Sequence, residues 1–187
     1  MKSFDRNYPK MASDYRGRTD LPRGIRNNNP GNIADDGTAW QGKVGSDGKF
    51  IIFSDMSWGT RAMATAITNM VKGGDGTLDA LIRAWSATDQ DAYVANVSQA
   101  TGIAPTATLT LDVPTLSAIM RAMISQEDAD SGALVTDQDI ADGIGKANST
   151  ILSFLQAGVV AAQQDPATTA GIALVVIVGL YLVFRKK

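Results

Sequence analysis

Residues 22–33 read Pro22-Arg23-Gly24-Ile25-Arg26-Asn27-Asn28-Asn29-Pro30-Gly31-Asn32-Ile33, and this stretch decides how the chain begins to fold. Three asparagines followed by Pro-Gly do not continue a helix or a strand. Asparagine competes with the backbone for hydrogen bonds, and Pro-Gly favours a turn. Apolar Ile25 and Ile33 flank this polar segment. The pattern predicts a rigid surface loop over residues 22–37, which ends at a second turn signal.

The amide groups of this loop have two interpretations. They can hydrogen-bond the hydroxyl and N-acetyl groups of a sugar, while nearby tryptophans stack on sugar rings. They can equally cap the loop itself and only fold the domain, because loops supply both roles. The residues that the first interpretation assigns to substrate binding are Arg26, Asn27, Asn28, Asn29, Asn32, Trp40 and Trp58.

Downstream of the loop the sequence predicts one hairpin and then helices. Residues 40–44 and 49–54 read as two strands joined by a turn over residues 45–48. Apolar periodicity and capping residues predict helices over residues 58–72, 78–86, 89–100, 112–127, 137–147 and 150–163. The caps expected are Asp55 or Ser57, then Thr77, Asp112, Thr136 and Ser149. The fold class predicted is mainly α (α+β), a helical domain with one small β-hairpin.

The composition excludes several kinds of site. The 187 residues include no cysteine and no histidine. Disulfide frameworks, Cys/His zinc sites and nucleophiles activated by histidine are therefore excluded. Carboxylates are the natural acid–base groups that remain, and no metal or cofactor is expected.

Charge is distributed unevenly along the chain. Residues 1–26 carry a net charge of +4, residues 27–166 carry −9, and the three residues 185–187 carry +3. A basic N-terminal segment can bind nucleic acid or an anionic membrane surface, but one interrupted by acids is more often a solvated tail. The acidic body argues against nucleic acid as a partner. We expect residues 1–21 to form an extended basic arm.

The C-terminal region predicts a membrane anchor. Residues 167–184 carry no charge, and Arg185-Lys186-Lys187 follows them. Eighteen helical residues rise about 27 Å, close to the roughly 30 Å of a hydrocarbon core. Asp165-Pro166 is a typical helix start. A buried soluble helix is the alternative. The basic tail favours a cytoplasmic C-terminus, yet the N-terminus lacks an apolar signal region, so a virion membrane, or insertion during genome delivery, fits better than export of the domain.

Several motifs together resemble a known family. The loop sequence from Arg23 to Ile33, then Trp40-Gln41-Gly42, Asp47-Gly48-Lys49-Phe50 and the segment 59–63 are similar to phage virion-associated proteins described as peptidoglycan-degrading. Weaker matches follow in order at residues 82–85, 91–94, 101–103 and 141–144. The resemblance implies a lysozyme-like or lytic-transglycosylase domain over residues 22–147. An apolar helix and linker (148–165) and a transmembrane helix with a basic stop (166–187) complete the expected organisation.

Glu127 is the candidate catalytic group, because it is the only glutamate in the chain. It ends an apolar-striped helix, where partial burial raises the pKa of a carboxyl group and suits it to act as a general acid. The family motif is often His-Glu-Asn-Gly, whereas this chain has Gln126-Glu127-Asp128-Ala129, so only the glutamate is kept. The common lysozyme arrangement also places the catalytic helix before the β-region, which is the reverse of the order here. The alternative is an exposed helix-end residue.

Four aspartates near the loop and hairpin are rival acids: Asp35, Asp36, Asp47 and Asp55. Each can instead stabilise a turn.

Three functions follow from these features. The leading one is a membrane-anchored virion protein, in the virion membrane or the host envelope, that cleaves peptidoglycan glycan strands locally during infection. The second is a catalytically silent structural protein that links capsid or tail proteins to a lipid membrane. The third is a glycan-binding module without cleavage.

Overall fold

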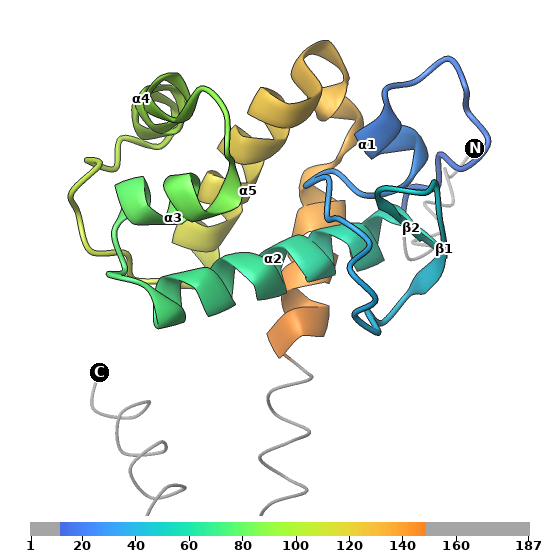
Figure 1. The fold of residues 1–187 in the computed structure, drawn as a ribbon, viewed down its shortest axis with the longest axis horizontal. Coiled ribbons are helices and arrows are strands. Elements are labelled where there is room, and N and C mark those ends of the chain that lie inside the picture. The colour runs from blue at the N-terminus through green and yellow to red at the C-terminus, as the bar shows by residue number, and fades with distance from the viewer. Residues whose placement is uncertain (1–11, 149–187) are drawn as a thin grey trace, which may run out of the picture. The chain divides into compact units, whose positions relative to one another are not determined.

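A computed structural model describes residues 12–148 of the chain, and these residues form a mainly helical domain (Figure 1). The elements are α1 (Arg23–Arg26), β1 (Lys43–Ser46), β2 (Ile51–Phe53), α2 (Met56–Gly73), α3 (Leu78–Trp85), α4 (Gln90–Thr101), α5 (Val113–Asp128) and the 3-10 helix η1 (Ala129–Leu134). Residues 137–148 are also helical. The mainly helical class with one hairpin is therefore confirmed.

The long helix α2 connects two ends of the domain. In Figure 1, α4 lies at the end opposite the β1–β2 hairpin and α1. Helix α5 packs against α4 and also contacts α1 and α2. Helix α5 thereby joins the end of the domain that contains α4 to the end that contains α1 and the hairpin.

The helices start where their capping residues predict. The Asp55 carboxylate accepts a hydrogen bond from the Ser57 N–H at 3.0 Å, so α2 begins at Met56 and not at residue 58. Thr77 caps α3 and Asp112 caps α5 in the same way. Thr136 and Asp139 bond each other's backbone N–H groups reciprocally, at 3.1 and 3.0 Å. This is a capping box, and it fixes the start of the last described helix.

The hairpin was predicted in kind but with the wrong boundaries. β1 runs from Lys43 to Ser46, whereas we expected a strand over residues 40–44. Gly42 has φ +78°, and a Cβ there would lie 2.2 Å from the Trp58 ring. Residues 40–42 therefore turn beneath that ring, and the strand begins only after them. β1 and β2 pair antiparallel with an irregularity between Lys43 and Gly45.

The last part of the predicted basic arm packs on the domain. Ser13 donates from its N–H and its hydroxyl to the Asp139 carboxylate, both at 2.9 Å. The Tyr15 hydroxyl donates to the Leu134 carbonyl at 3.0 Å. These bonds join residues far apart in sequence, so Ser13 and Tyr15 pack against the domain that the sequence predicts over residues 22–147.

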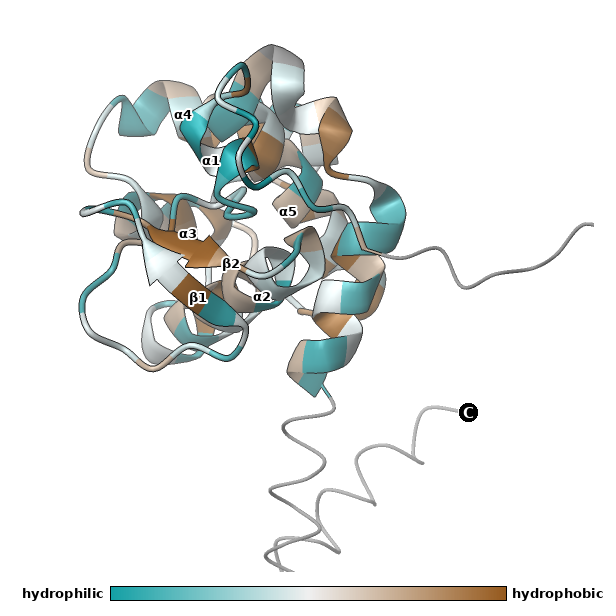
Figure 2. Cartoon of the chain, turned by 90° about the vertical axis from the view of Figure 1, so that its right-hand side faces the viewer, coloured by the Kyte–Doolittle hydropathy of each residue, from teal (hydrophilic) through white to brown (hydrophobic). Residues whose placement is uncertain are grey.

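Apolar side chains are buried both beneath the hairpin and within the helices. β2 is strongly apolar (Figure 2), and its Ile51 and Phe53 are fully buried with Ala62 of α2. Met120, Met123 and Ile124 of α5 are also fully buried, as the predicted stripe of that helix requires.

No helix within residues 12–148 has the length and apolar character needed to cross a bilayer. The expected apolar helix over 150–163 and the expected transmembrane segment 166–187 lie outside the described residues.

Candidate active site

The side chain of Glu127 is the meeting point of several segments. Its Oε1 accepts hydrogen bonds from the Trp85 indole N–H at 3.3 Å and from the Tyr93 hydroxyl at 3.1 Å. Its Oε2 accepts a hydrogen bond from the Asn32 side-chain amide at 3.0 Å. The donors come from α3, α4 and the loop after α1, while Glu127 itself comes from α5. The carboxylate is thus held in one orientation by three parts of the fold.

Asn32 reaches Glu127 because of the turn that the loop sequence predicts. Asn32 has φ +48°, a left-handed conformation that asparagine tolerates better than most residues. Gly31, just before it, lies against Trp85, and a Cβ at Gly31 would come within 2.9 Å of the indole ring. A side chain at position 31 would displace the tryptophan. The Pro30-Gly31-Asn32 turn therefore sets both the amide and the indole beside the carboxylate.

A cleft of about 700 Å³ opens beside this carboxylate. Three of the predicted site residues line it together: Asn32, Trp40 and Glu127. Phe50 and Trp85 add two further aromatic walls. A cleft with aromatic sides and few convergent polar groups has the general character of a site for an organic ligand, and aromatic faces suit sugar rings. The remaining lining residues are Gly31, Ile33, Ala34, Asp36, Lys49, Ala66, Met70, Ser86 and Ala87.

The three consecutive asparagines do not line this cleft. They are buried, with exposed fractions of 5%, 0% and 0%. Asn27 donates to the Asp47 carboxylate at 2.8 Å, and Asn28 donates to the Asp14 carboxylate at 2.8 Å. Asn29 donates to two backbone carbonyls of the loop and β2, each at 2.9 Å. Their positions correspond to the self-capping interpretation of the loop rather than to direct substrate contact.

Two other predicted site residues also lie away from the cleft lining. The Arg26 guanidinium donates to the Leu21 carbonyl at 3.3 Å. The Trp58 ring covers Gly42, and the Lys146 ammonium lies 4.6 Å from the ring centroid. Trp58 therefore packs against the turn before β1 and the last described helix.

The rival acids have structural partners. Asp55 caps α2, and Asp35 forms an ion pair with Lys43, which lowers its pKa. Hydrogen bonds from the Phe50 N–H and the Asn27 amide lower the pKa of Asp47 to about 2. Thr38 lowers the pKa of Asp36 by hydrogen bonding. A general acid must hold a proton near neutral pH, so the lowered values disfavour Asp35, Asp36 and Asp47.

Trp85 and Tyr93 are two site residues that the sequence analysis does not name as candidates. Each directs a polar tip to Glu127. Burial, reinforced by the negative charge of Glu127, raises the pKa of the Tyr93 hydroxyl. The hydroxyl therefore keeps its proton and donates. A buried tyrosine or tryptophan normally needs a polar partner, and this was the available signal.

Asp128, the neighbour of Glu127, is a buried acid that the sequence did not single out. Its side chain is 6% exposed, and its Oδ2 atom has no hydrogen-bond partner. A Cβ on Gly24 would lie 2.6 Å from that oxygen, so α1 packs directly on the carboxyl group. Burial, with a smaller contribution from the charge of Glu127, raises the pKa of Asp128 to about 7.

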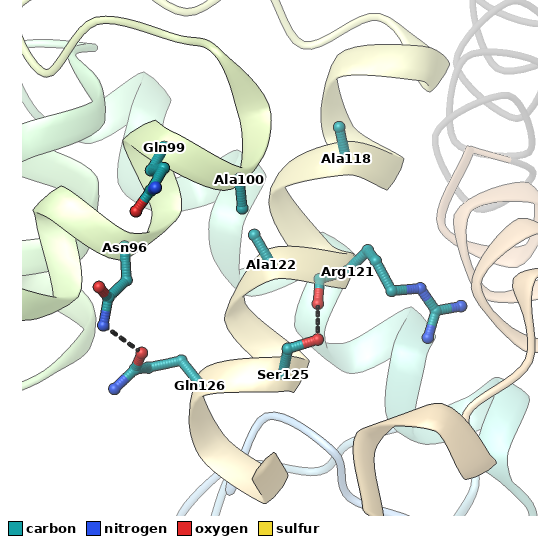
Figure 3. A pocket seen from close by; sticks show the side chains of 8 residues that line it. All are labelled: Asn96, Gln99, Ala100, Ala118, Arg121, Ala122, Ser125 and Gln126. Carbon is teal, nitrogen blue, oxygen red and sulfur yellow. Dashed lines mark hydrogen bonds between the residues drawn. The ribbon is translucent and has the colours of Figure 1, made fainter. Parts of the chain in front are cut away.

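A second groove lies between α4 and α5 and has a different character (Figure 3). Its volume is about 560 Å³, and it is lined by amides, alanines, Ser125 and Arg121, with no carboxylate and no aromatic ring. Asn96 and Gln126 bond across it at 2.9 Å. It offers neither acid–base chemistry nor stacking surfaces.

Among residues 12–148, no group of three or more histidine, cysteine, aspartate or glutamate side chains is placed to hold a metal ion. Comparison with models of known protein families and with curated proteins gives no significant match.

Proposed function

We propose that the domain is a lysozyme-like peptidoglycan lytic transglycosylase in which Glu127 is the general acid and base. The observation that carries the proposal is the position of the chain's only glutamate. It lies in the wall of an aromatic-lined cleft and is oriented by Trp85, Tyr93 and Asn32.

The reaction assigns two successive roles to one carboxyl group. The protonated Glu127 donates its proton to the glycosidic oxygen as the bond to the anomeric carbon breaks. The resulting carboxylate then accepts a proton from the sugar's 6-hydroxyl, whose oxygen closes the 1,6-anhydro ring. No water is consumed and no second carboxylate is required. The other acid in the cleft lining, Asp36, has a lowered pKa and is bonded to Thr38.

Tyr93 suits both protonation states of Glu127. The Trp85 indole N–H can only donate, whereas a phenolic hydroxyl can donate or accept. When Glu127 is ionised, Tyr93 donates to it. When Glu127 carries a proton on Oε1, the Tyr93 oxygen can accept a hydrogen bond from that O–H group. The hydroxyl thus keeps the carboxyl group oriented through the proton cycle.

The setting proposed for this activity follows from the sequence. The uncharged run 167–184 with its basic tail supports a membrane anchor. The family resemblance supports a phage particle, with virion proteins and the lipid membrane as partners. Anchoring in the virion membrane or in the host envelope would hold the domain against the cell wall during infection.

A non-cleaving glycan-binding or structural virion domain is the second candidate. The observation that favours it is the set of three hydrogen bonds that Glu127 accepts. A purely structural role for Glu127, in which its carboxylate joins α3, α4 and the loop after α1, explains the same three contacts.

The test is incubation of the purified full chain with peptidoglycan and mass spectrometry of the soluble products. Release of anhydro-muropeptides is the expected result, and Glu127→Gln is expected to reduce it about 10²–10⁴-fold without a matching loss in melting temperature. Ordinary hydrated muropeptides would indicate hydrolysis. Absence of any release, with binding to peptidoglycan retained, would favour the second candidate.

A further inference from the structure

Lys49 places a positive charge on the cleft beside Glu127. Its side chain lines the cleft and is exposed, and its ammonium lies 5.0 Å from the centroid of the Phe50 ring. It is the only basic residue among those that line the cleft in the described part of the chain. A ligand stacked on the aromatic walls would therefore lie close to one cation.

Two acids near Lys49 are already engaged by other groups: Asp47, two positions before it, and Asp35, whose N–H donates to the Lys49 carbonyl at 2.9 Å. The Asp47 carboxylate accepts hydrogen bonds from Asn27 at 2.8 Å and from the Phe50 N–H at 2.9 Å, and Arg23 lies 3.3 Å from it. Asp35 is paired with Lys43 at 2.5 Å. Within residues 12–148, the Lys49 ammonium forms no ion pair.

The acids within the cleft lining are engaged as well. Asp36 accepts a hydrogen bond from the Thr38 N–H at 2.9 Å. Glu127 accepts its three hydrogen bonds from Trp85, Tyr93 and Asn32. Neither carboxylate forms an ion pair with Lys49 within residues 12–148, so the Lys49 ammonium is available to a ligand on the hairpin side of the cleft.

We propose that Lys49 binds a carboxylate carried by the glycan, so that the cleft prefers an acidic glycan to a neutral one. This inference rests on the proposed function and names the kind of sugar that the site selects. In peptidoglycan, every second sugar carries a lactyl ether, and a carboxylate is present either on that ether or on the attached peptide. Chitin has the same backbone linkage and N-acetyl groups but carries no acid, so Lys49 gives it no ionic contact.

The size of the preference follows from the exposure of Lys49. Ion pairs at solvent-exposed positions contribute modestly, and their usual range corresponds to about two- to fivefold in affinity. Salt screens such pairs. The preference is therefore expected to be small, confined to acidic ligands and reduced at high ionic strength.

The test measures binding to the full chain carrying Glu127→Gln, so that ligands are not cleaved. The ligands are chitohexaose, glycan strands from which the peptides have been removed, and glycan strands with intact peptides. Adding Lys49→Gln is expected to weaken binding of an acidic ligand two- to fivefold at low salt, while chitohexaose binding stays unchanged. Lys49→Arg is expected to retain the preference. If Lys49→Gln weakens binding of the peptide-free strands, Lys49 binds the lactyl carboxylate. If it weakens binding of the intact strands only, Lys49 binds a peptide carboxylate.

Lys72→Gln is the matched control, since Lys72 is an exposed lysine at the end of α2 and does not line the cleft. If Lys49→Gln weakens the binding of neutral and acidic ligands equally, or weakens the binding of none, the role of Lys49 is overturned and the proposed function stands. Failure of all three ligands to bind would overturn both.

Discussion

The protonation state of Asp128 gives a sharp test of how the domain is built around Glu127. Asp128 is buried between α5 and α1, and the close approach of Gly24 leaves its Oδ2 atom without a hydrogen-bond partner. Ionising a carboxyl group in such a place is unfavourable. We expect the folded protein to hold a proton on Asp128 at pH values where the unfolded chain has lost it.

The size and sign of the effect follow from the two pKa values. The pKa of Asp128 is about 7 in the folded state, against 3.8 for the ordinary side chain, because of burial and then the charge of Glu127. The stabilising contribution of the protonated group is complete below pH 4 and is lost as the pH rises to about 7. At about 1.4 kcal/mol per pKa unit, the whole loss is on the order of 4 kcal/mol. That is a large part of the stability of an ordinary domain.

Few other groups complicate the pH dependence of stability in this range. The chain has no histidine, whose titration would overlap it. The pKa of Asp14 is lowered by its hydrogen bond with Arg16, and that of Asp47 is lowered to about 2. Both carboxyl groups therefore affect stability only at more acidic pH. The free energy of unfolding, measured with urea at pH 4.5–8.5, is expected to fall with rising pH in the unmodified protein.

Asp128→Asn should give a much flatter pH dependence over the same range, because asparagine does not ionise. Asp137→Asn is the control, since Asp137 is 98% exposed, and it should leave the slope as it is in the unmodified protein. Parallel curves for Asp128→Asn and the unmodified protein would show that Asp128 is ionised throughout, and would refute the argument from burial.

Three further predictions follow from other contacts. Asn29→Ala removes the amide donor to the buried Ile51 carbonyl of β2 and one of two donors to the Ile33 carbonyl, and should cost about 1–3 kcal/mol in urea unfolding; an unchanged midpoint would contradict this. Gly59→Ala should lower the melting temperature far more than Gly73→Ala, because a Cβ at Gly59 meets a backbone oxygen at 1.8 Å and one at Gly73 meets nothing. Tyr93→Phe should lower kcat for glycan cleavage about tenfold or more with little change in KM, and a loss confined to KM would remove Tyr93 from the proton cycle of Glu127.

The helical part of the fold could be predicted from the sequence because its signals are local. Asp55, Thr77 and Asp112 each bond a backbone N–H two or three residues away. Such contacts depend only on neighbouring residues. The start of β1 could not be predicted, because it depends on Trp58 packing over Gly42, sixteen positions earlier in the chain.

The candidate site was predictable only in part, for the same reason. The uniqueness of Glu127 and the Pro30-Gly31-Asn32 turn pointed to two groups that the fold does bring together. Tyr93 and Trp85 could not be identified as site residues from the sequence, because their partner lies 34 and 42 positions along the chain. Periodicity shows that such side chains face inward, but it does not show that an acid lies there.

The buried asparagines connect the loop structurally to the cleft. Asn27 bonds Asp47 in the hairpin turn, and Asn29 bonds the carbonyl of Ile51 in β2. These bonds hold the loop against the hairpin, and the same loop then extends Asn32 to Glu127 on the opposite side. A change in the asparagine run would therefore alter the spacing between the aromatic wall of the hairpin and the carboxylate of α5. The asparagine run therefore supports the cleft through the loop and the hairpin, although the three asparagines do not line it.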